Sequence, residues 1–369
     1  MLADPEVLAL VRRVFSPRPA DRALAILVDL PDAVAPDRPA WRWRRETAAA
    51  WAAAIDRGKA ELGLDAVHLY AYPNVHRANA DLPATLPRDG GGEEALDDVL
   101  RSHAIVIALT EMSATAPLKV AARRIPFRAA TMPGFTEAMV PALRLDYVEI
   151  DRRVTALKRL LDDATGADVT FRVDGRDAYR LHLDLRHRTG HASGGVFPEP
   201  GQVGNLPSGE AYVVPYEGEI PGDPSRSAGT LPVQLGDEVL LYRVEGNRAV
   251  AVAPVGAPGP AAAREAALIA GEPAYRNLAE LGLGVLSGFG VEPTGEVLLD
   301  EKLGLHVAFG RSDHFGGTVG PADFSGPDAV VHIDRVFVPA MQPRVSIASA
   351  DLVLPDRTVA LIRDDAWVV

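Results

Sequence analysis

The sequence predicts an α/β N-terminal domain with an open parallel sheet, followed by a mainly antiparallel β, barrel-like C-terminal domain. The chain has 369 residues, of which 47% are hydrophobic, and at about 150 residues per domain this is enough for roughly two domains with their own cores. Short apolar runs alternate with helical segments up to Gly166, whereas strand-like runs separated by turn residues follow it. We therefore expect an α/β sheet domain at residues 1–165 and a β-rich domain at residues 166–369.

Strands and helices alternate in the first half of the chain. Four short apolar runs are typical of buried strands, at residues 23–31, 66–73, 103–110 and 127–134. Helical segments lie between and after these runs, at residues 41–63, 92–101, 114–124 and 146–166. Since strands that alternate with helices form βαβ units, we expect parallel strands with helices on both faces of the sheet.

This predicted sheet lacks the loops that bind nucleotide phosphates. No GxGxxG follows the run at 23–31, and no GxxxxGK[ST] occurs anywhere in the chain. The loop at residues 31–39 is rich in proline instead. Because a fold alone does not carry a function, we do not expect a nucleotide site here.

Strand-like runs dominate the second half. They lie at residues 167–175, 210–216, 238–246, 248–255, 295–301, 305–310, 328–338 and 351–359. The dipeptide Gly246-Asn247 between two of them is typical of a hairpin turn, and one helix is expected at 261–271. Many short strands separated by turn residues favour an antiparallel, barrel-like domain.

Composition excludes several kinds of site. The chain has 38 Lys+Arg and 50 Asp+Glu, a net charge of −12, and no Lys/Arg-rich tract, so we do not expect binding to nucleic acid. It has no Cys, which excludes disulfides, thiolate nucleophiles and Cys-zinc sites. Asp4 and Glu6 lie where a signal peptide carries positive charge, and no run approaches the ~20 apolar residues that cross a bilayer. We expect a cytoplasmic protein without membrane association.

The strongest candidate for chemistry is a histidine and an aspartate in the run at 328–338. His332 and Asp334 are two residues apart on a predicted strand, so both side chains lie on one face, ~7 Å apart along the backbone. A charged pair buried on an apolar strand is costly unless its charge is compensated. Two interpretations stay open. Either both side chains bind a divalent cation, or His332 and Asp334 form a hydrogen bond with each other in the core.

Other acidic residues and a histidine lie in similar surroundings. Glu210 begins an apolar run directly after a glycine, and Glu280 lies among apolar residues. Glu301 precedes His306 by five residues, and His306 lies inside an apolar run. Together with the pair at 332 and 334, these residues favour one metal site in the second half.

Four segments of the second half resemble a known enzyme family. NLPSGEAYVVP, NLAELGLG, DEKLGLHVAFG and VVHIDRVFV, in this order, resemble signature segments of the aminopeptidase T/aminopeptidase S metallopeptidases, which are leucyl aminopeptidase-like. The resemblance covers about residues 165–340. It implies a hydrolase with two divalent ions (Zn, Co or Mn) that releases N-terminal residues from a peptide or small amide substrate. It also implies a homodimer with its site in an enclosed cavity.

The resemblance implies roles for single residues. The metal ligands would be Glu210, Glu280, His306, His332 and Asp334. Glu301 would be the general base that takes a proton from metal-bound water. The family has a tyrosine shortly after HVAFG, where this chain has Asp313 and His314. His314 would stabilise the oxyanion in its place, and which of the two residues replaces the tyrosine stays open.

Two other functions fit the same residues. His306, His332 and Asp334 also form the two-His-one-carboxylate set of a mononuclear non-haem iron(II) ring-cleaving dioxygenase. Dihydroxypyridine dioxygenases resemble the same family, but they have a histidine near the position of Glu280, and Glu210 together with Glu280 favours two metals. The third alternative is a family member without peptidase activity that works in a biosynthetic pathway.

Three further histidines precede the Glu210 segment, namely His182, His187 and His191. His187 and His191 would reach a substrate from a loop over the site, or they would belong to an exposed polar hairpin. The arginines that flank His187 favour the hairpin.

Overall fold

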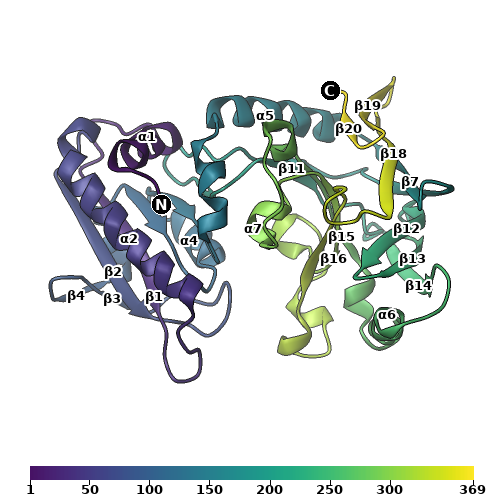
Figure 1. Ribbon diagram of the computed structural model, residues 1–369, viewed down its shortest axis with the longest axis horizontal. Coiled ribbons are helices and arrows are strands. Elements are labelled where there is room, and N and C mark those ends of the chain that lie inside the picture. The colour runs from purple at the N-terminus through teal and green to yellow at the C-terminus, as the bar shows by residue number, and fades with distance from the viewer. The chain divides into compact units, whose positions relative to one another are not determined.

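The computed structural model describes residues 1–369, the side chain of Asp177 excepted, and Figure 1 shows the path of the chain. The described chain forms two compact units. Unit 1 comprises Met1–Arg152, Ser193–Gly209 and Thr294–Leu299, and unit 2 comprises Arg153–Ala192, Glu210–Pro293 and Asp300–Val369. Each unit is therefore assembled from segments that are distant in the sequence.

Unit 1 is built on a parallel sheet with the strand order β10-β6-β5-β1-β2. Its strands are β1 (Ala23–Leu30), β2 (Ala66–Pro73), β5 (Ile105–Ala108), β6 (Arg128–Thr131) and β10 (Val203–Asn205). Every neighbouring pair is parallel, which confirms the sheet that the first half predicts. The edge strand β10 comes from the second half of the sequence, and its three residues are too few to show a pattern.

Helices and a short hairpin complete this unit. The helices are α1 (Asp4–Phe15), α2 (Pro39–Gly58), α3 (Leu96–Ser102) and α4 (Thr115–Ala122), with 3-10 segments at Lys59–Leu62 and Glu137–Arg144, and the hairpin pairs β3 (Thr85–Pro87) with β4 (Glu93–Ala95). Helix α2 buries one stripe that includes Trp41, Trp51 and Ile55. Helix α5 (Tyr147–Asp163) begins in unit 1 and ends in unit 2.

An aspartate of the chain itself occupies the place where such sheets bind phosphates. Ligands of open α/β sheets bind beyond the carboxyl ends of the strands, where the strand order reverses. Here Asp29, near the end of β1, accepts hydrogen bonds from the backbone N–H groups of Glu111 (2.7 Å) and Met112 (2.8 Å) and from the indole of Trp41 (2.9 Å). These donors are therefore satisfied internally, in keeping with the missing phosphate-binding motifs.

Unit 2 contains two antiparallel sheets. The eight-stranded sheet has the order β14-β13-β12-β8-β7-β18-β19-β20, and the five-stranded sheet has the order β17-β16-β15-β11-β9 in the described chain. The first sheet consists of β7 (Gly166–Val173), β8 (Asp177–Asp184), β12 (Ala228–Leu235), β13 (Glu238–Glu245), β14 (Arg248–Pro254), β18 (Val345–Val353), β19 (Thr358–Arg363) and β20 (Ala366–Trp367). The second, which we call the site sheet, consists of β9 (His191–Ser193), β11 (Glu210–Val213), β15 (Leu278–Gly284), β16 (Leu305–Gly310) and β17 (His332–Val336).

Antiparallel pairing in the second half is confirmed, but the barrel-like closure is not. Both strand orders are open in the part of the chain that the structure describes, so the strands form two separate sheets. The predicted helix at 261–271 is present as α6 (Pro260–Gly271). The predicted strand at 295–301 is wrong, because Val297–Asp300 forms the helical turn α7. A short apolar run such as VLL does not distinguish strand from helix.

The two faces of the site sheet differ. On one face Phe309 packs against Tyr242 of the eight-stranded sheet, with ring centroids 5.0 Å apart, and stacks on Tyr275 at 5.7 Å. Tyr275 lies in one of five short 3-10 segments, at Pro273–Arg276, Leu286–Phe289, Asp313–Phe315, Pro321–Asp323 and Pro327–Ala329 of the described chain. The opposite face carries the polar groups described below.

Among the described residues, the helices are too short or too polar to span a bilayer.

Candidate metal centre

One face of the site sheet gathers the predicted ligands from four strands. Because opposite residues in antiparallel strands share a face, the register places each ligand across from a residue with a small side chain or none on one neighbouring strand. The pairs are Glu210 with Gly284, His306 with Gly282, Glu280 and Asp334 each with Ala308, and His332 with Gly310. The large polar side chains therefore lean into space that glycine and alanine leave free.

Two of these glycines are required by close approach. A Cβ atom on Gly282 would lie 1.9 Å from Nε2 of His306, and one on Gly284 would lie 2.3 Å from the carbonyl carbon of Lys302. Neither contact is sterically allowed, so any other residue at these positions would displace His306 or the backbone that carries Lys302. The LGLG sequence of β15 is thus part of the site.

The carboxylate of Glu280 lies between two imidazoles. Its Oε1 is 3.3 Å from Nε2 of His306, and its Oε2 is 3.2 Å from Nε2 of His332. Oδ1 of Asp334 lies 3.5 Å from Nε2 of His332 and 3.9 Å from Nε2 of His306. Oε2 of Glu210 lies 3.7 Å from Nε2 of His306. The structure therefore brings all five predicted ligands together, and we call them the ligand cluster.

Backbone carbonyls fix the orientation of both histidines. Nδ1 of His306 donates to the carbonyl of Gly304 (3.2 Å), and Nδ1 of His332 donates to the carbonyl of Arg311 (2.8 Å). A proton held at Nδ1 leaves Nε2 of each ring directed into the cluster. This outer hydrogen bond is how proteins set the tautomer of metal-binding histidines.

The buried carboxylates of the cluster are stabilised by nearby positive charge. Burial would lower the pKa of His306, but hydrogen bonding to Glu280 and the charge of Asp334 outweigh it and raise the pKa to about 9. Burial would raise the pKa of Glu280, but hydrogen bonds from His306 and His332 lower it to about 2. The pKa of Asp334 is also held far below its usual range, against burial, chiefly by His332. A divalent cation would supply the charge that protons on the imidazoles supply here.

Lys302 is a member of the site that sequence reasoning missed. Its side chain is 2% exposed, and its ammonium contacts the carboxylates of Glu210 and Glu301. Burial would lower the pKa of Lys302, but these two carboxylates raise it, so the ammonium stays charged. Burial raises the pKa of Glu301 to about 8, with Lys302 opposing the shift. Glu301 thus bonds to a lysine at the edge of the cluster.

Tyr212 is a second residue that was missed. It lies two residues after Glu210 on β11, on the same face and opposite Gly282. Burial and then the charges of Glu280 and Glu210 raise the pKa of Tyr212, so its hydroxyl keeps its proton. The two-residue spacing from Glu210 is the sequence signal that would have found it.

The segment after β16 brings His314 beside the cluster. The rings of His314 and His332 meet edge to face, with centroids 5.5 Å apart. Burial, followed by the charges of His332 and Arg311, lowers the pKa of His314 to about 4, so its imidazole is neutral at pH 7. Asp313 instead bonds to Arg311, with 2.5 Å between Oδ1 and Nε.

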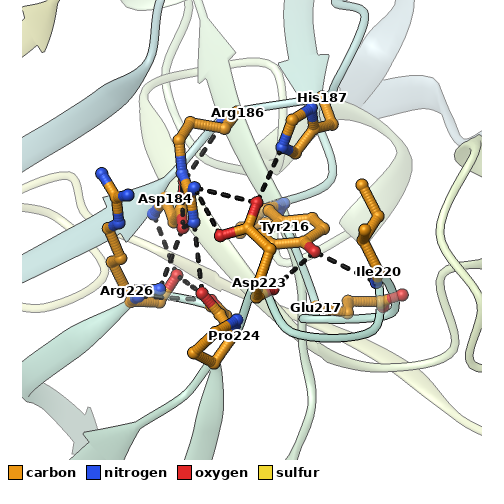
Figure 2. Close-up of polar contacts among 12 residues, drawn as sticks. Asp184, Arg186, His187, Tyr216, Glu217, Ile220, Asp223, Pro224 and Arg226 are labelled. Carbon is orange, nitrogen blue, oxygen red and sulfur yellow. Dashed lines mark hydrogen bonds and ion pairs between the residues drawn. The ribbon is translucent and has the colours of Figure 1, made fainter.

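Of the three remaining candidate histidines, one lies beside the site. His182 pairs with Asp168 (2.8 Å), and His187 pairs with Asp223 (3.1 Å; Figure 2). Both imidazoles are more than a third exposed. His191 stacks on Tyr212, with ring centroids 5.1 Å apart, and its Nε2 lies 2.9 Å from the carbonyl oxygen of Phe315.

Comparison with known proteins corrects the predicted family. No family model matches the sequence, and no curated protein matches it. Among solved structures, the chain is similar to 2,5-dihydroxypyridine dioxygenase from Pseudomonas putida KT2440, with a TM-score of 0.63 and 16% identity, over 100% of this chain and 99% of that one. The likeness shows a common fold along the whole length.

The predicted membership of the aminopeptidase T/aminopeptidase S family, and with it the hydrolase and peptidase activity, is therefore wrong, because a solved structure that matches the whole chain is a dioxygenase. The peptide or amide substrate, the general-base role of Glu301 and the oxyanion role of His314 depended on that activity. The prediction of a metal site stands on the ligand cluster itself, which contains two groups of three side chains with converging donor atoms. A pair of metal ions and a homodimer stay predictions.

Proposed function

We propose that this chain is a mononuclear non-haem iron(II) dioxygenase that cleaves the ring of a small hydroxylated aromatic compound. The observation that carries the proposal is the convergence of His306, His332 and Asp334, in which Oδ1 of the aspartate lies within 3.9 Å of both Nε2 atoms. Two histidines and one carboxylate with open positions are the ligand set of non-haem iron(II) oxygenases.

The shared fold supports this proposal. The structural counterpart that matches the whole chain is a dioxygenase named for 2,5-dihydroxypyridine, which is a planar hydroxylated ring. At 16% identity the fold alone is common to the two proteins, so the substrate of this chain follows from its own site.

Lys302 favours one metal ion over two. Four carboxyl groups lie in and beside the cluster, and the ammonium of Lys302 contacts two of them, Glu210 and Glu301. Burial raises the pKa of Glu301 to about 8, so Glu301 holds its proton at pH 7 and the ammonium compensates Glu210. One dication with neutral imidazoles then balances Glu280 and Asp334. Oε2 of Glu210 has no hydrogen-bond partner among the described residues and lies 3.7 Å from Nε2 of His306, so this oxygen would be free to interact with a cation held by His306.

The residues divide into those that would hold the ion and those that would contact a substrate. When bound, iron(II) would supply the one-electron chemistry that activates dioxygen. The side chain of His306 is 1% exposed, whereas that of His332 is 20% exposed, so a substrate reaches the cluster on the His332 side. The protonated hydroxyl of Tyr212 can donate a hydrogen bond to a ring oxygen, and the neutral imidazole of His314 can accept a hydrogen bond from a ring hydroxyl.

The test is oxygen uptake by the iron-loaded protein. The protein is stripped of metal, loaded with iron(II) without air, and mixed with 2,5-dihydroxypyridine in an oxygen electrode. We expect equimolar consumption of oxygen and ring, followed by loss of the ring's ultraviolet absorbance. Zinc-loaded protein is the control and should consume no oxygen. Oxygen uptake no faster with iron than with zinc, for dihydroxypyridine and for a panel of dihydroxybenzenes, would overturn the proposal.

A further inference from the structure

A row of aromatic rings borders the accessible side of the ligand cluster. Tyr212 and Phe315 meet edge to face with centroids 4.9 Å apart, and Phe315 meets the ring of His332 in the same way at 5.5 Å. His314 packs against Phe315 at 3.8 Å and also faces His332. We call Tyr212, Phe315 and His314 the aromatic wall.

The wall lies where the cluster is open. The side chain of His314 is 35% exposed and that of His332 is 20% exposed, whereas the side chains of the other four ligands are at most 8% exposed. Phe315 is half-buried. A molecule that reaches His332 therefore passes these rings. Their neutral faces and edges suit a planar, electron-rich ring rather than a charged chain.

One buried carboxylate fixes both ends of the segment that carries two residues of the wall, His314 and Phe315. Glu217, whose side chain is 3% exposed, accepts hydrogen bonds from the hydroxyl of Ser312 (2.5 Å), from the backbone N–H of Thr318 (2.6 Å) and from the hydroxyl of Thr318 (2.7 Å). Asn277 adds a fourth donor at 2.7 Å. Residues 312 and 318 flank His314 and Phe315, so Glu217 closes this segment into a fixed loop.

Glu217 itself lies in a loop that ion pairs and hydrogen bonds hold in place. Arg188 reaches Glu217 (3.6 Å), Glu219 (2.6 Å) and the carbonyl of Gly316 (3.3 Å). Figure 2 shows the rest of this network, in which Arg186 joins Asp184 to Asp223 and the hydroxyl of Tyr216 donates to the carbonyl of Asp223 (2.7 Å). The contacts of this network join residues of the loops around Glu217. We therefore expect the network to fix the position of these loops and not to bind the metal.

We propose that the aromatic wall is the surface on which the substrate ring lies beside His332, and that Glu217 is the positioning residue for this wall. The proposal rests on the proposed function and deepens it. It assigns the substrate to planar hydroxylated aromatic or nitrogen-heteroaromatic rings. The proposal also assigns ring selectivity to the aromatic wall and metal binding to the ligand cluster.

The test measures ring binding without turnover. Iron-loaded protein is titrated with 2,5-dihydroxypyridine in the absence of oxygen, by calorimetry, and its iron content is measured in parallel. Phe315→Ala should weaken ring binding about tenfold with the iron content unchanged, since an aromatic contact of this kind is worth about that factor. Glu217→Ala should weaken ring binding similarly, and Glu217→Gln should restore most of it because an amide oxygen still accepts from Ser312 and Thr318.

Glu245→Ala is the control, because Glu245 also pairs with an arginine, Arg243, but lies exposed on β13 and not in the network around Glu217. It should change ring affinity less than twofold. Unchanged ring binding in Phe315→Ala would overturn the wall, and so would loss of iron from this variant, which would mean that Phe315 only supports His332. Wild-type protein that holds iron and consumes oxygen with a ring, but whose ring affinity is unchanged in both Phe315→Ala and Glu217→Ala, would overturn the wall alone. Failure of the wild-type protein to hold iron would overturn the proposed function, and ring titration of the same protein would still report on the wall.

Discussion

Nε2 of His332 lies 3.5 Å from Oδ1 of Asp334, two residues further along the same strand. Because both side chains project from one face of β17, a single backbone segment fixes their separation. The neighbouring strands then add His306 and Glu280 by register, opposite the small residues Gly282 and Ala308. The site is thus preorganised by sheet geometry.

Removing the imidazole of His332 should abolish metal binding while the fold survives. We expect His332→Ala to lower the affinity for iron(II) by at least about 100-fold, because removal of an outer partner alone typically costs 10–100-fold. Metal content after dialysis measures the loss. His182→Ala is the control, since His182 also pairs with an aspartate but lies on β8, away from the cluster. Equal iron content in the two variants would contradict the assignment.

Lys302→Met should leave two buried carboxylates without their cation. We expect a loss of about 3–5 kcal/mol in the free energy of unfolding, because breaking a buried ion pair leaves uncompensated charge. Excess divalent metal should recover part of the loss by binding between Glu210 and Glu301. Denaturant titration with and without added metal measures both effects. The control Lys59→Met removes an exposed pair with Asp56 and should change little; comparable losses in the two variants would refute the role of Lys302.

Gly282→Ala should disturb the site through a single methyl group. That carbon would lie 1.9 Å from Nε2 of His306, so the imidazole must leave its place and iron binding should fall more than tenfold. In the control Gly271→Ala, the added carbon meets no described heavy atom within 4 Å, and iron binding should be unchanged. Full iron content in Gly282→Ala would show that His306 is dispensable.

Metal-free protein should lose stability as the pH rises from about 6.5 to about 9. The pKa of His306 is raised to about 9 in the folded state, and a raised pKa means that the folded protein holds the proton more tightly than the unfolded chain. Its contribution to stability is therefore complete below the unfolded pKa and disappears as the pH passes the folded pKa. Glu301, with its pKa raised to about 8, acts in the same direction.

Bound metal should reverse this trend, because a cation binds the neutral imidazole and competes with the proton. The difference in Tm between metal-loaded and metal-free protein should therefore grow over the same pH range. Calorimetric melts at several pH values measure it. A constant difference from pH 6.5 to 9 would mean that the histidines do not exchange protons for metal.

The sequence predicts most of the fold for a simple physical reason. Buried parallel strands are continuous apolar runs, so β1, β2, β5 and β6 are visible, and the amphipathic stripe of α5 is visible as well. The edge strand β10 and the turn α7 are too short to show a period. The open ends of the two antiparallel sheets were not visible, because closure depends on strand tilt and stagger rather than on local pattern.

For the site, alternation found the ligands but not their surroundings. His332, Asp334 and His306 stand out because charged groups rarely lie inside apolar strands. Lys302 was missed because the sequence DEK is typical of an exposed turn, and only the folded chain shows its ammonium between two carboxylates. The peptidase prediction was wrong because imidazole and carboxylate ligands serve both hydrolysis and oxygen chemistry. The choice between them depends on how many cations the site holds and on the groups that border it.

The most direct measurement is the number of iron ions bound per chain after anaerobic loading, determined by elemental analysis of the desalted protein. One ion per chain in the wild-type protein, with none in His332→Ala, is the result expected for a mononuclear centre in which Lys302 supplies the remaining positive charge. Two ions per chain, or one that persists in His332→Ala, would contradict it.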